Sequence, residues 1–165
     1  KVSDTFRDKV YPGGLTYSGH PLACASAVAS INIFKEEGII EHARSLGADV
    51  LEPGLAKLQA NHPCVGDVRG LGVFWALELV KDRETRVPHH ELGALTTQRC
   101  LELGLSMNIR RRPERGSVWR IAPPLTVTKA DIDLAMTIFD QALEESRNAL
   151  AKKPGAAGAR GQQAA

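Results

Sequence analysis

The sequence predicts a small α/β or α+β domain in which helices pack on one face of a mostly antiparallel sheet. Three observations support this prediction. Apolar residues recur at helical spacing near the C-terminus, β-branched and aromatic residues are concentrated in short central segments, and Gly or Pro separates most of these segments. The expected order of elements is helix, helix, strand, helix, strand, strand, helix.

Two helices are expected in the first 60 residues. Pro21 suits the first position of a helix because its fixed φ angle is already helical, and a segment rich in Ala and Ser follows over Leu22–Glu37. Small side chains on several faces of this segment indicate close approach by other backbone. Gly38 is expected to end the helix, and a second helix is expected over about Ile39–Ala60.

The second helix is followed by the first expected strand. The Pro53-Gly54 pair would interrupt the helix, and Asn61-His62-Pro63 would end it. β-Branched and aromatic residues are concentrated over Val73–Val80, which predicts a strand. A charged loop is expected over Lys81–Pro88.

A helix and a hairpin are expected next. The helix covers His89–Leu103 and ends at Gly104. A short strand over Leu105–Ile109 would pair with Val118–Ala122, and Pro123-Pro124 would stop the second strand.

The last helix begins at a capping box. Thr128 and Asp131 have the spacing of this motif, with Asp in place of the usual Glu. Six apolar residues then follow helical spacing and give one apolar face: Ile132, Ala135, Met136, Phe139, Ala142 and Leu143. The tail over residues 150–165 is rich in Gly, Ala and Gln and has little to bury, so we expect it to be disordered.

Composition and charge exclude several classes of protein. Hydrophobic residues make up 43% of the chain and charged residues 24%, which is near the globular average and argues against global disorder. No apolar run approaches the roughly 18 residues that a membrane span needs. The net charge is +2, but residues 151–165 carry three basic residues and no acid. The rest of the chain is therefore close to neutral, and a nucleic-acid-binding surface is not expected.

The cysteines indicate the redox compartment. Cys24, Cys64 and Cys100 are odd in number and widely spaced, and they form neither a CxxC motif nor a metal-ligand cluster. Reduced thiols in a reducing compartment are therefore expected, and with them a cytoplasmic location.

The first candidate site is the stretch Thr16-Tyr17-Ser18-Gly19-His20-Pro21, which directly precedes a helix. Backbone N–H groups and the positive end of the helix dipole can hold an anion there, and a Thr or Ser hydroxyl can donate to phosphate. The alternative is that Ser18 or Thr16 simply caps the helix with no ligand present. Composition alone favours this alternative.

The second candidate site is a cluster of arginines in the expected hairpin. Five arginines stand against one acid between residues 110 and 120: Arg110, Arg111, Arg112, Arg115 and Arg120. Guanidinium groups bind carboxylate or phosphate through two parallel hydrogen bonds. In a strand, Arg120 lies on the same face as Val118 and Ala122, opposite Trp119 and Ile121. We expect Arg120 to be partly buried and to need a partner, either protein or ligand. The alternative is a solvated, salt-bridged hairpin, which explains Arg110, Arg111 and Arg115 and stays open for Arg120.

Other motifs predict no chemistry. Arg69-Gly70-Leu71-Gly72 lacks the third glycine and the preceding strand of a dinucleotide fingerprint, so a turn with a bend or close backbone approach at its glycines is expected. His89-His90-Glu91 is expected to be an exposed helix start rather than a metal site. The sequence contains no HExxH, GxSxG or Walker motif, which disfavours a self-contained hydrolase or NTPase.

Three stretches in series resemble the C-terminal part of a class III pyridoxal-phosphate-dependent aminotransferase of fold type I. They are Gly14–Ala25, then Val68–Gly72 leading into Ala76–Val80, and then Arg120–Thr128 with the helix that follows. The resemblance covers about residues 1–147 and includes the order and spacing of the stretches.

The resemblance implies the roles of three residues. Thr16 matches the family's Thr that binds the phosphate of pyridoxal 5'-phosphate in the neighbouring subunit's site, which implies an obligate homodimer. Arg120 matches the arginine that commonly holds a substrate carboxylate. Some ω-amine transaminases use a mobile arginine earlier in the hairpin instead, and Arg112 is the nearest match to it.

The sequence departs from the family in one respect. The Schiff-base lysine lies in a Lys-Gly-containing segment upstream of the Thr16 stretch in the family, and no such segment is present; Lys1 and Lys9 lack this Gly-rich context. The chemistry needs that lysine. The chain is therefore expected to be a C-terminal fragment that is inactive alone.

The resemblance implies a division of the chain and a reaction. Residues 1–37 would end the large cofactor domain, 38–149 would form the small domain, and 150–165 the tail. The complete enzyme would move an amino group from an amino acid or ω-amine to a 2-oxo acid, pyruvate or 2-oxoglutarate. The alternative is a non-enzymatic α/β module that binds an anionic metabolite or a partner subunit through its arginine hairpin.

Overall fold

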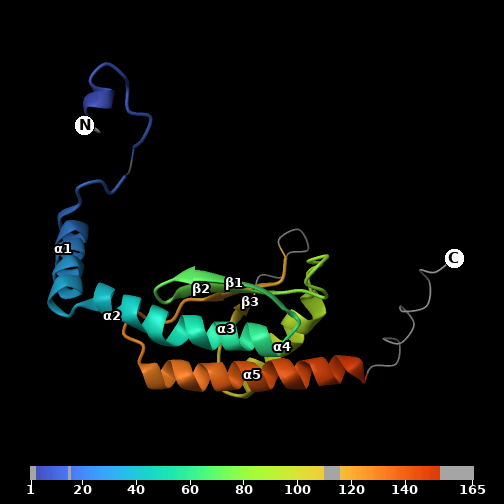
Figure 1. Ribbon diagram of the computed structural model, residues 1–165. Helices are drawn as coiled ribbons and strands as arrows, with labels where there is room; N and C mark the ends of the chain where they lie inside the picture. Colours follow the sequence, from blue (N-terminus) through green and yellow to red (C-terminus); the bar gives the residue numbers. More distant parts are fainter. Residues whose placement is uncertain (1–2, 15, 110–115, 153–165) are drawn as a thin grey trace. The chain divides into compact units, whose positions relative to one another are not determined.

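The computed structural model describes residues 3–14, 16–109 and 116–152 (Figure 1). Contacts divide the chain into two units, Lys1–Gly38 and Ile39–Ala165. Two of the sequence predictions fall outside the described residues. One is the role of Arg112, and the other is the disorder of the tail from residue 153 onward. The predicted start of the tail at residue 150 is wrong, because Leu150 and Ala151 belong to the last helix.

The first unit contains a short 3₁₀ helix, η1 (Ser3–Phe6), and the helix α1 (Pro21–Glu36). Pro21 occupies the first turn of α1, as predicted, where the absence of a backbone N–H costs no hydrogen bond within the helix. Gly38 follows the helix with a φ of 61°, a left-handed conformation that favours glycine. The predicted bounds of α1 are therefore confirmed to within one residue. None of its residues is buried.

The second unit begins with three consecutive helical segments: α2 (Ile39–Leu46), the π-helical η2 (Gly47–Leu51) and α3 (Glu52–Asn61). The predicted interruption exists, but it lies before Pro53 rather than at Pro53-Gly54. A proline ring clashes with the carbonyl four residues earlier, which here belongs to Asp49. The wider π turn over η2 is where the chain accommodates that clash.

A four-stranded antiparallel sheet follows, in the order β1-β2-β4-β3. Its strands are β1 (Val65–Leu71), β2 (Phe74–Leu79), β3 (Asn108–Ile109) and β4 (Val118–Ile121). The predicted hairpin pairing of β3 with β4 is confirmed.

The strand β1 is a correction to the sequence analysis, which predicted a turn over Arg69–Gly72. Arg69, Gly70 and Leu71 instead pair with β2, and the turn lies at Gly72, whose φ is 56°. The close approach predicted at Gly70 is confirmed. A Cβ there would lie 2.5 Å from the Phe74 carbonyl oxygen and from the indole ring of Trp75.

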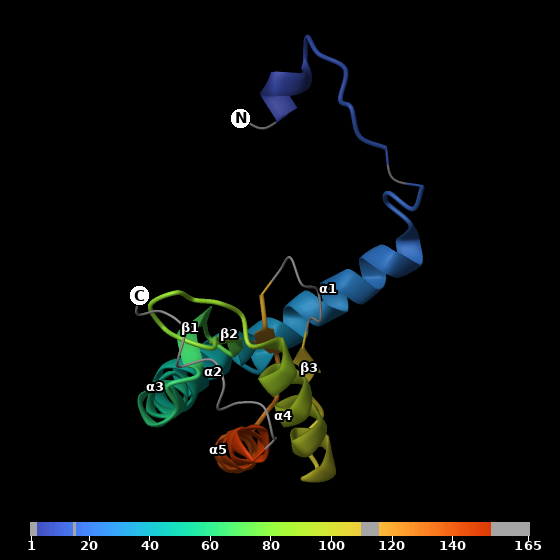
Figure 2. The same cartoon turned by 90° about the vertical axis from the view of Figure 1, so that its right-hand side faces the viewer.

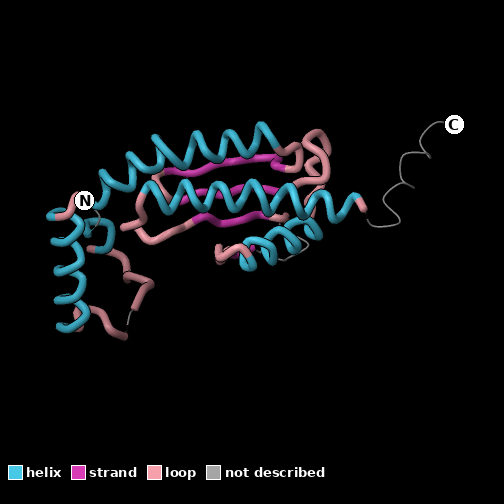
Figure 3. The backbone as a smooth tube through the Cα atoms, turned by 90° about the horizontal axis from the view of Figure 1, so that it is seen from below, coloured by secondary structure: helices cyan, strands magenta, loops and turns pink. Residues whose placement is uncertain are grey.

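Helices cover one face of the sheet. Figures 1 and 2 show α3, α4 (His90–Glu102) and α5 (Lys129–Ala151) on the same side of the strands, and Figure 3 views the sheet from that side. The core lies between these layers and is built mainly from alternate strand residues and one stripe of α5: Trp75, Leu77, Leu79, Trp119, Ile121, Ile132, Phe139, Ala142 and Leu143. The predicted fold class and apolar face of the last helix are thus confirmed.

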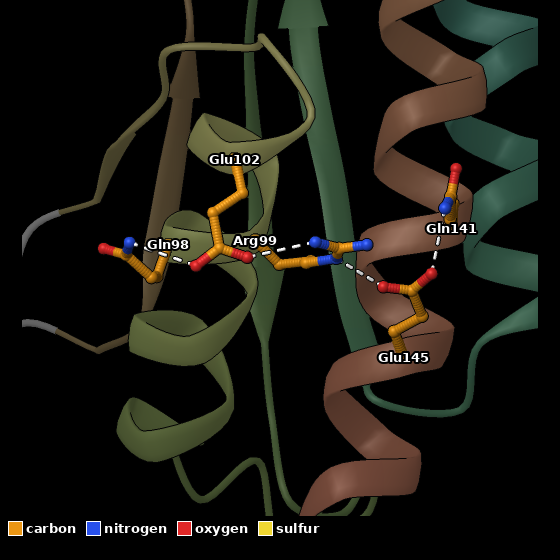
Figure 4. A network of polar contacts seen from close by, with 5 residues as sticks. All are labelled: Gln98, Arg99, Glu102, Gln141 and Glu145. Atoms are coloured by element: carbon orange, nitrogen blue, oxygen red, sulfur yellow. Dashed lines mark hydrogen bonds and ion pairs between the residues drawn. The ribbon is translucent and has the colours of Figure 1, made fainter.

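The helices α4 and α5 are joined by a network of polar contacts (Figure 4). Arg99 on α4 donates to Glu102 over 3.0 Å and to Glu145 on α5. Gln98 and Gln141 donate to the same two carboxylates. These hydrogen bonds lower the pKa of both glutamates. The network therefore links the helix that leads into β3 to the helix that follows β4.

The predicted capping box at the start of α5 is confirmed. The Thr128 side chain accepts from the Asp131 backbone N–H, and the Asp131 carboxylate accepts from the Thr128 backbone N–H. In the part of the chain that the structure describes, no helix is long and apolar enough to cross a membrane.

Candidate functional site

Thr16 lies in the first unit, in the turn over residues 16–19 that directly precedes α1. The turn closes with a hydrogen bond from the His20 N–H to the Tyr17 carbonyl oxygen, 3.1 Å, and Gly19 adopts a φ of 72°. The Thr16 side chain is exposed. A hydroxyl donor therefore stands free beside the positive end of a 16-residue helix.

The interpretation of this stretch as a simple helix cap is wrong. His20, not Ser18 or Thr16, is the N-cap residue of α1, and no side chain makes a capping hydrogen bond there. The first N–H groups of α1 are therefore not satisfied by a side-chain cap, and this arrangement is compatible with an oxyanion at the turn.

Arg120 lies in the second unit, at the centre of β4. Its cross-strand neighbours are Ala76 on β2 and Asn108 on β3, so these three side chains share the face of the sheet opposite the core. The prediction that Trp119 and Ile121 face the other way is confirmed, since both are buried. The predicted partial burial of Arg120 is wrong: its side chain is exposed, because the helices α3, α4 and α5 of the second unit cover the other face of the sheet.

A cavity of about 330 Å³ adjoins Arg120. Its lining is mostly apolar and comes from η2, the segment around β3, the end of β4 and the first turns of α5. Besides Arg120, its polar lining residues are Ser106, Asn108 and Asp131. The hollow is thus mostly apolar, with Arg120 among its few polar lining residues, which is the usual composition of a small-molecule pocket.

The charge of Arg120 is not neutralised within the described part of the chain. Asp131, the acid that lines the same cavity, is engaged in the capping box, and its hydrogen bonds from Thr128 lower its pKa. Arg69, its neighbour two strands away on the same face, is paired with Asp67 and lies 3.8 Å from Glu78. Of the two arginines in this row, Arg120 is therefore the one available to a carboxylate ligand.

The structure does not bring Thr16 and Arg120 into one described body, because they belong to the two separate units. The other arginines of the predicted cluster fall within residues 110–115, outside the described part. The described residues contain no group of three or more His, Cys, Asp or Glu that could hold a metal ion. His89 and His90, predicted to be an exposed helix start, are half-buried, with His89 as the N-cap of α4.

An exposed arginine without an ion-pair partner in the described part of the chain, beside an apolar hollow, is compatible with the binding of a small carboxylate. Comparison with protein families identifies the chain: residues 2–143 match the model of the class-III aminotransferases, and the chain belongs to this family. Members of the family depend on pyridoxal phosphate.

The similar proteins of known name agree with the family assignment, but their names indicate different reactions. The chain is 37% identical over 128 residues to ethanolamine-phosphate phospho-lyase homolog 1 from Caenorhabditis elegans, covering 78% of this chain and 27% of that protein. It is also 37% identical over 142 residues to the 4-aminobutyrate aminotransferase GabT from Escherichia coli, covering 85% of this chain and 33% of GabT. The chain therefore spans between a quarter and a third of the length of these relatives.

Solved structures show the same fold. A transaminase obtained by ancestral reconstruction matches with a TM-score of 0.75 and 32% identity, covering 90% of this chain and 32% of that chain. An aminotransferase from Vibrio fluvialis, solved in its PMP-bound form, matches with a TM-score of 0.69 and 33% identity, covering 84% of this chain and 30% of that one. The sheet with its helical layer is thus an architecture shared with about a third of each of these transaminase chains.

The described residues fit the phosphate end of the family's cofactor. The exposed Thr16 hydroxyl can donate to a phosphate oxygen, and the uncapped start of α1 favours a negative charge. Sequence reasoning found both Thr16 and Arg120. It missed the cavity beside Arg120, because that hollow is assembled from four segments that are separate in the sequence.

Proposed function

We propose that this chain is the C-terminal portion of an aminotransferase that moves an amino group from an amino acid or ω-amine to a 2-oxo acid, with pyruvate or 2-oxoglutarate as acceptor. The observation that carries the proposal is the unpaired Arg120 beside an apolar cavity, in a chain of the class-III family. Every such reaction has at least one substrate with a carboxylate, and a guanidinium binds a carboxylate through two parallel hydrogen bonds.

Arg120 would fix that carboxylate so that the reacting carbon is held in one position. The apolar wall of the adjoining cavity would exclude water from the ion pair and so strengthen it. Arg112 remains the alternative for this role, on the resemblance to ω-amine transaminases. Support for Arg120 comes from its central place in the sheet, which fixes its backbone between two neighbouring strands.

Thr16 would donate its hydroxyl to the phosphate of pyridoxal 5'-phosphate. The cofactor supplies the electron sink for chemistry at the amine-bearing carbon when it is bound. Because the family resemblance places this Thr in the neighbouring subunit's site, we propose a homodimer in which each site takes Thr16 from the partner. The three free cysteines, two of them buried, are compatible with the cytoplasmic location expected from the sequence.

The proposed activity is that of a protein of the relatives' full length. Residues 1–37 would belong to its large domain and 38–149 to its small domain. The 165-residue chain has no Lys in the Gly-rich context that the resemblance requires of the Schiff-base lysine. We therefore expect the chain alone to show no turnover. The activity tests below use the longer protein.

The test of Arg120 compares substrates with and without a carboxylate. In the longer protein, Arg120→Ala should raise KM for carboxylate substrates much more than for simple amines. Arg120→Lys keeps the charge but not the two-pronged geometry and should give an intermediate effect. Arg44→Ala, at an exposed position of α2, is the matched control. Equal effects of Arg120→Ala on both substrate types would indicate a structural role for Arg120. Turnover in the absence of any 2-oxo acid acceptor would show that the protein catalyses a lyase reaction rather than transamination.

The test of Thr16 measures cofactor retention. Thr16→Ala should weaken cofactor binding by about 1–3 kcal/mol if one hydrogen bond to a charged acceptor is lost. Ser18→Ala alters a hydroxyl in the same turn and should have a smaller effect. Dialysis followed by the absorbance of the retained cofactor measures the difference. Unchanged retention in Thr16→Ala would remove Thr16 from the site.

A further inference from the structure

A second cavity, also of about 330 Å³, lies where the end of β2, the start of α4 and the C-terminal part of α5 meet. It shares no lining residue with the cavity beside Arg120. Backbone hydrogen bonds hold its walls together: the Val80 N–H donates to the Cys64 carbonyl oxygen, and the His89 N–H donates to that of Leu79, at 2.8 and 2.9 Å. The hollow is therefore a surface feature whose walls are joined by backbone hydrogen bonds.

The charged groups that line this cavity are all positive or basic. Lys81 and Arg147 contribute two cations, and no Asp or Glu is among the lining residues. Lys81 makes no ion pair in the described part of the chain, and Arg147 has no carboxylate partner there either. Arg147 does contact the Nδ1 atom of His62, at 3.4 Å. Two exposed cations without a carboxylate partner thus line one hollow, and their combined charge favours an anion there.

His89 adds a neutral donor to the same cavity. Its Nδ1 atom accepts a hydrogen bond from the Leu92 N–H, 3.3 Å, which places the proton of the neutral ring on Nε2. Burial and the neighbouring Lys81 lower the pKa of His89, so the ring stays neutral at physiological pH and still offers an N–H. The Nε2 atom has no acceptor among the described residues.

The remaining polar residues of the lining, Cys64 and Asn148, do not offset this charge. Burial raises the pKa of the Cys64 thiol, so it carries no negative charge near neutral pH, and the Asn148 side chain is uncharged. Leu92, Leu150 and Ala151 form the apolar part of the lining. The site therefore combines two cations and an imidazole N–H from three different elements.

We propose that this cavity binds a small oxyanion of the phosphate class, held by Lys81, Arg147 and the Nε2–H of His89. Phosphate suits the site because it carries up to two negative charges and accepts several hydrogen bonds at once. The proposal is independent of the aminotransferase assignment, since none of these residues belongs to the cavity beside Arg120. Its failure would leave that assignment unchanged.

The experiment is a titration of the 165-residue chain with inorganic phosphate, against sodium chloride at equal ionic strength. We expect phosphate to raise the unfolding temperature in a saturable manner, as ligand linkage requires, and chloride to have no such effect. An equal effect of the two salts would reduce the interaction to general screening and overturn the proposal. So would a lack of any phosphate-dependent shift.

Two variants and one control locate the binding. Lys81→Met removes a side chain that makes no hydrogen bond within the described part of the chain. His89→Asn removes the ring N–H while keeping a good N-cap residue for α4. Each should weaken the apparent phosphate affinity by about tenfold or more, the usual effect of losing one hydrogen bond to a charged group. Lys57→Met, at an exposed position of α3 outside the cavity, changes the net charge equally and should leave the affinity unchanged. Wild-type affinity in Lys81→Met would place the phosphate elsewhere.

Discussion

The contact between η2 and the β1–β2 turn has no room for a single added carbon. Gly47 in η2 packs directly on the backbone of Gly72, so a Cβ at residue 47 would lie 2.5 Å from the Gly72 carbonyl carbon and closer still to its oxygen. That oxygen also accepts a hydrogen bond from the Trp75 indole N–H, 2.6 Å. Gly47→Ala must therefore push two backbone segments apart and disturb a buried tryptophan.

The expected cost follows from two opposing effects. Overpacking a close contact costs about 1–3 kcal/mol, and here both sides are backbone, which cannot rotate away. Replacing Gly by Ala in a helical segment recovers up to about 1 kcal/mol. The net expectation is a loss of about 2 kcal/mol in the free energy of unfolding. For a domain of this size that lowers the melting temperature by roughly 8 °C.

Urea unfolding of the 165-residue chain, followed by tryptophan fluorescence, measures this loss as a shift of the midpoint at constant m-value. Gly54→Ala is the matched control. Its Cβ would meet only the end of the Met136 side chain, at 3.1 and 3.3 Å, and that flexible chain can move. We expect the control to stay within about 0.5 kcal/mol of the wild type. If Gly47→Ala were equally stable, the contact of η2 with the turn could not be what positions the sheet on its helices.

Two further predictions concern titration and thiol reactivity. Arg99→Met should lower the free energy of unfolding near neutral pH. The difference from the wild type should shrink as pH falls below about 5, because the two glutamate partners of Arg99 have lowered pKa values and the stabilisation they provide is lost when they are protonated. Parallel pH–stability curves of variant and wild type would contradict this. In the native chain a thiol reagent should label Cys24 rapidly and spare Cys64 and Cys100, because burial raises the pKa of both, that of Cys100 to about 11. The number of modified thiols, measured before and after unfolding, tests this prediction. Rapid labelling of more than one thiol in the native chain would show that the core opens.

The elements that sequence reasoning located well are those whose signals are local. The capping box at Thr128 and the helix start at Pro21 depend on side chains within one turn of each other, so their spacing alone is decisive. The apolar stripe of α5 likewise repeats at a fixed interval. In each case no distant contact is needed to define the element.

The elements that it missed depend on pairing and packing rather than on local propensity. The glycines of β1 weaken its strand pattern, and it becomes a strand by pairing with β2 in a tight hairpin, where Gly70 leaves room for the Trp75 ring. The π turn of η2 lies just before Pro53, but Gly47 in it also packs on Gly72, which is distant in the sequence. The contact between Gly47 and Gly72 cannot be read from the residues near η2.

The error at Arg120 has a different cause. Its face was inferred correctly, but burial on that face depends on what covers it, and Leu71 and Phe74 on the same face are 85% and 61% exposed. Apolar side chains of this size gain about 1.5–3 kcal/mol each when they are fully buried. We therefore expect the open face to be covered in a protein of the relatives' length. Covering it would remove water from Arg120 as well, and a desolvated guanidinium without a carboxylate is strongly unfavourable. Covering this face would thus both bury its apolar side chains and make an ion pair between Arg120 and a substrate carboxylate favourable.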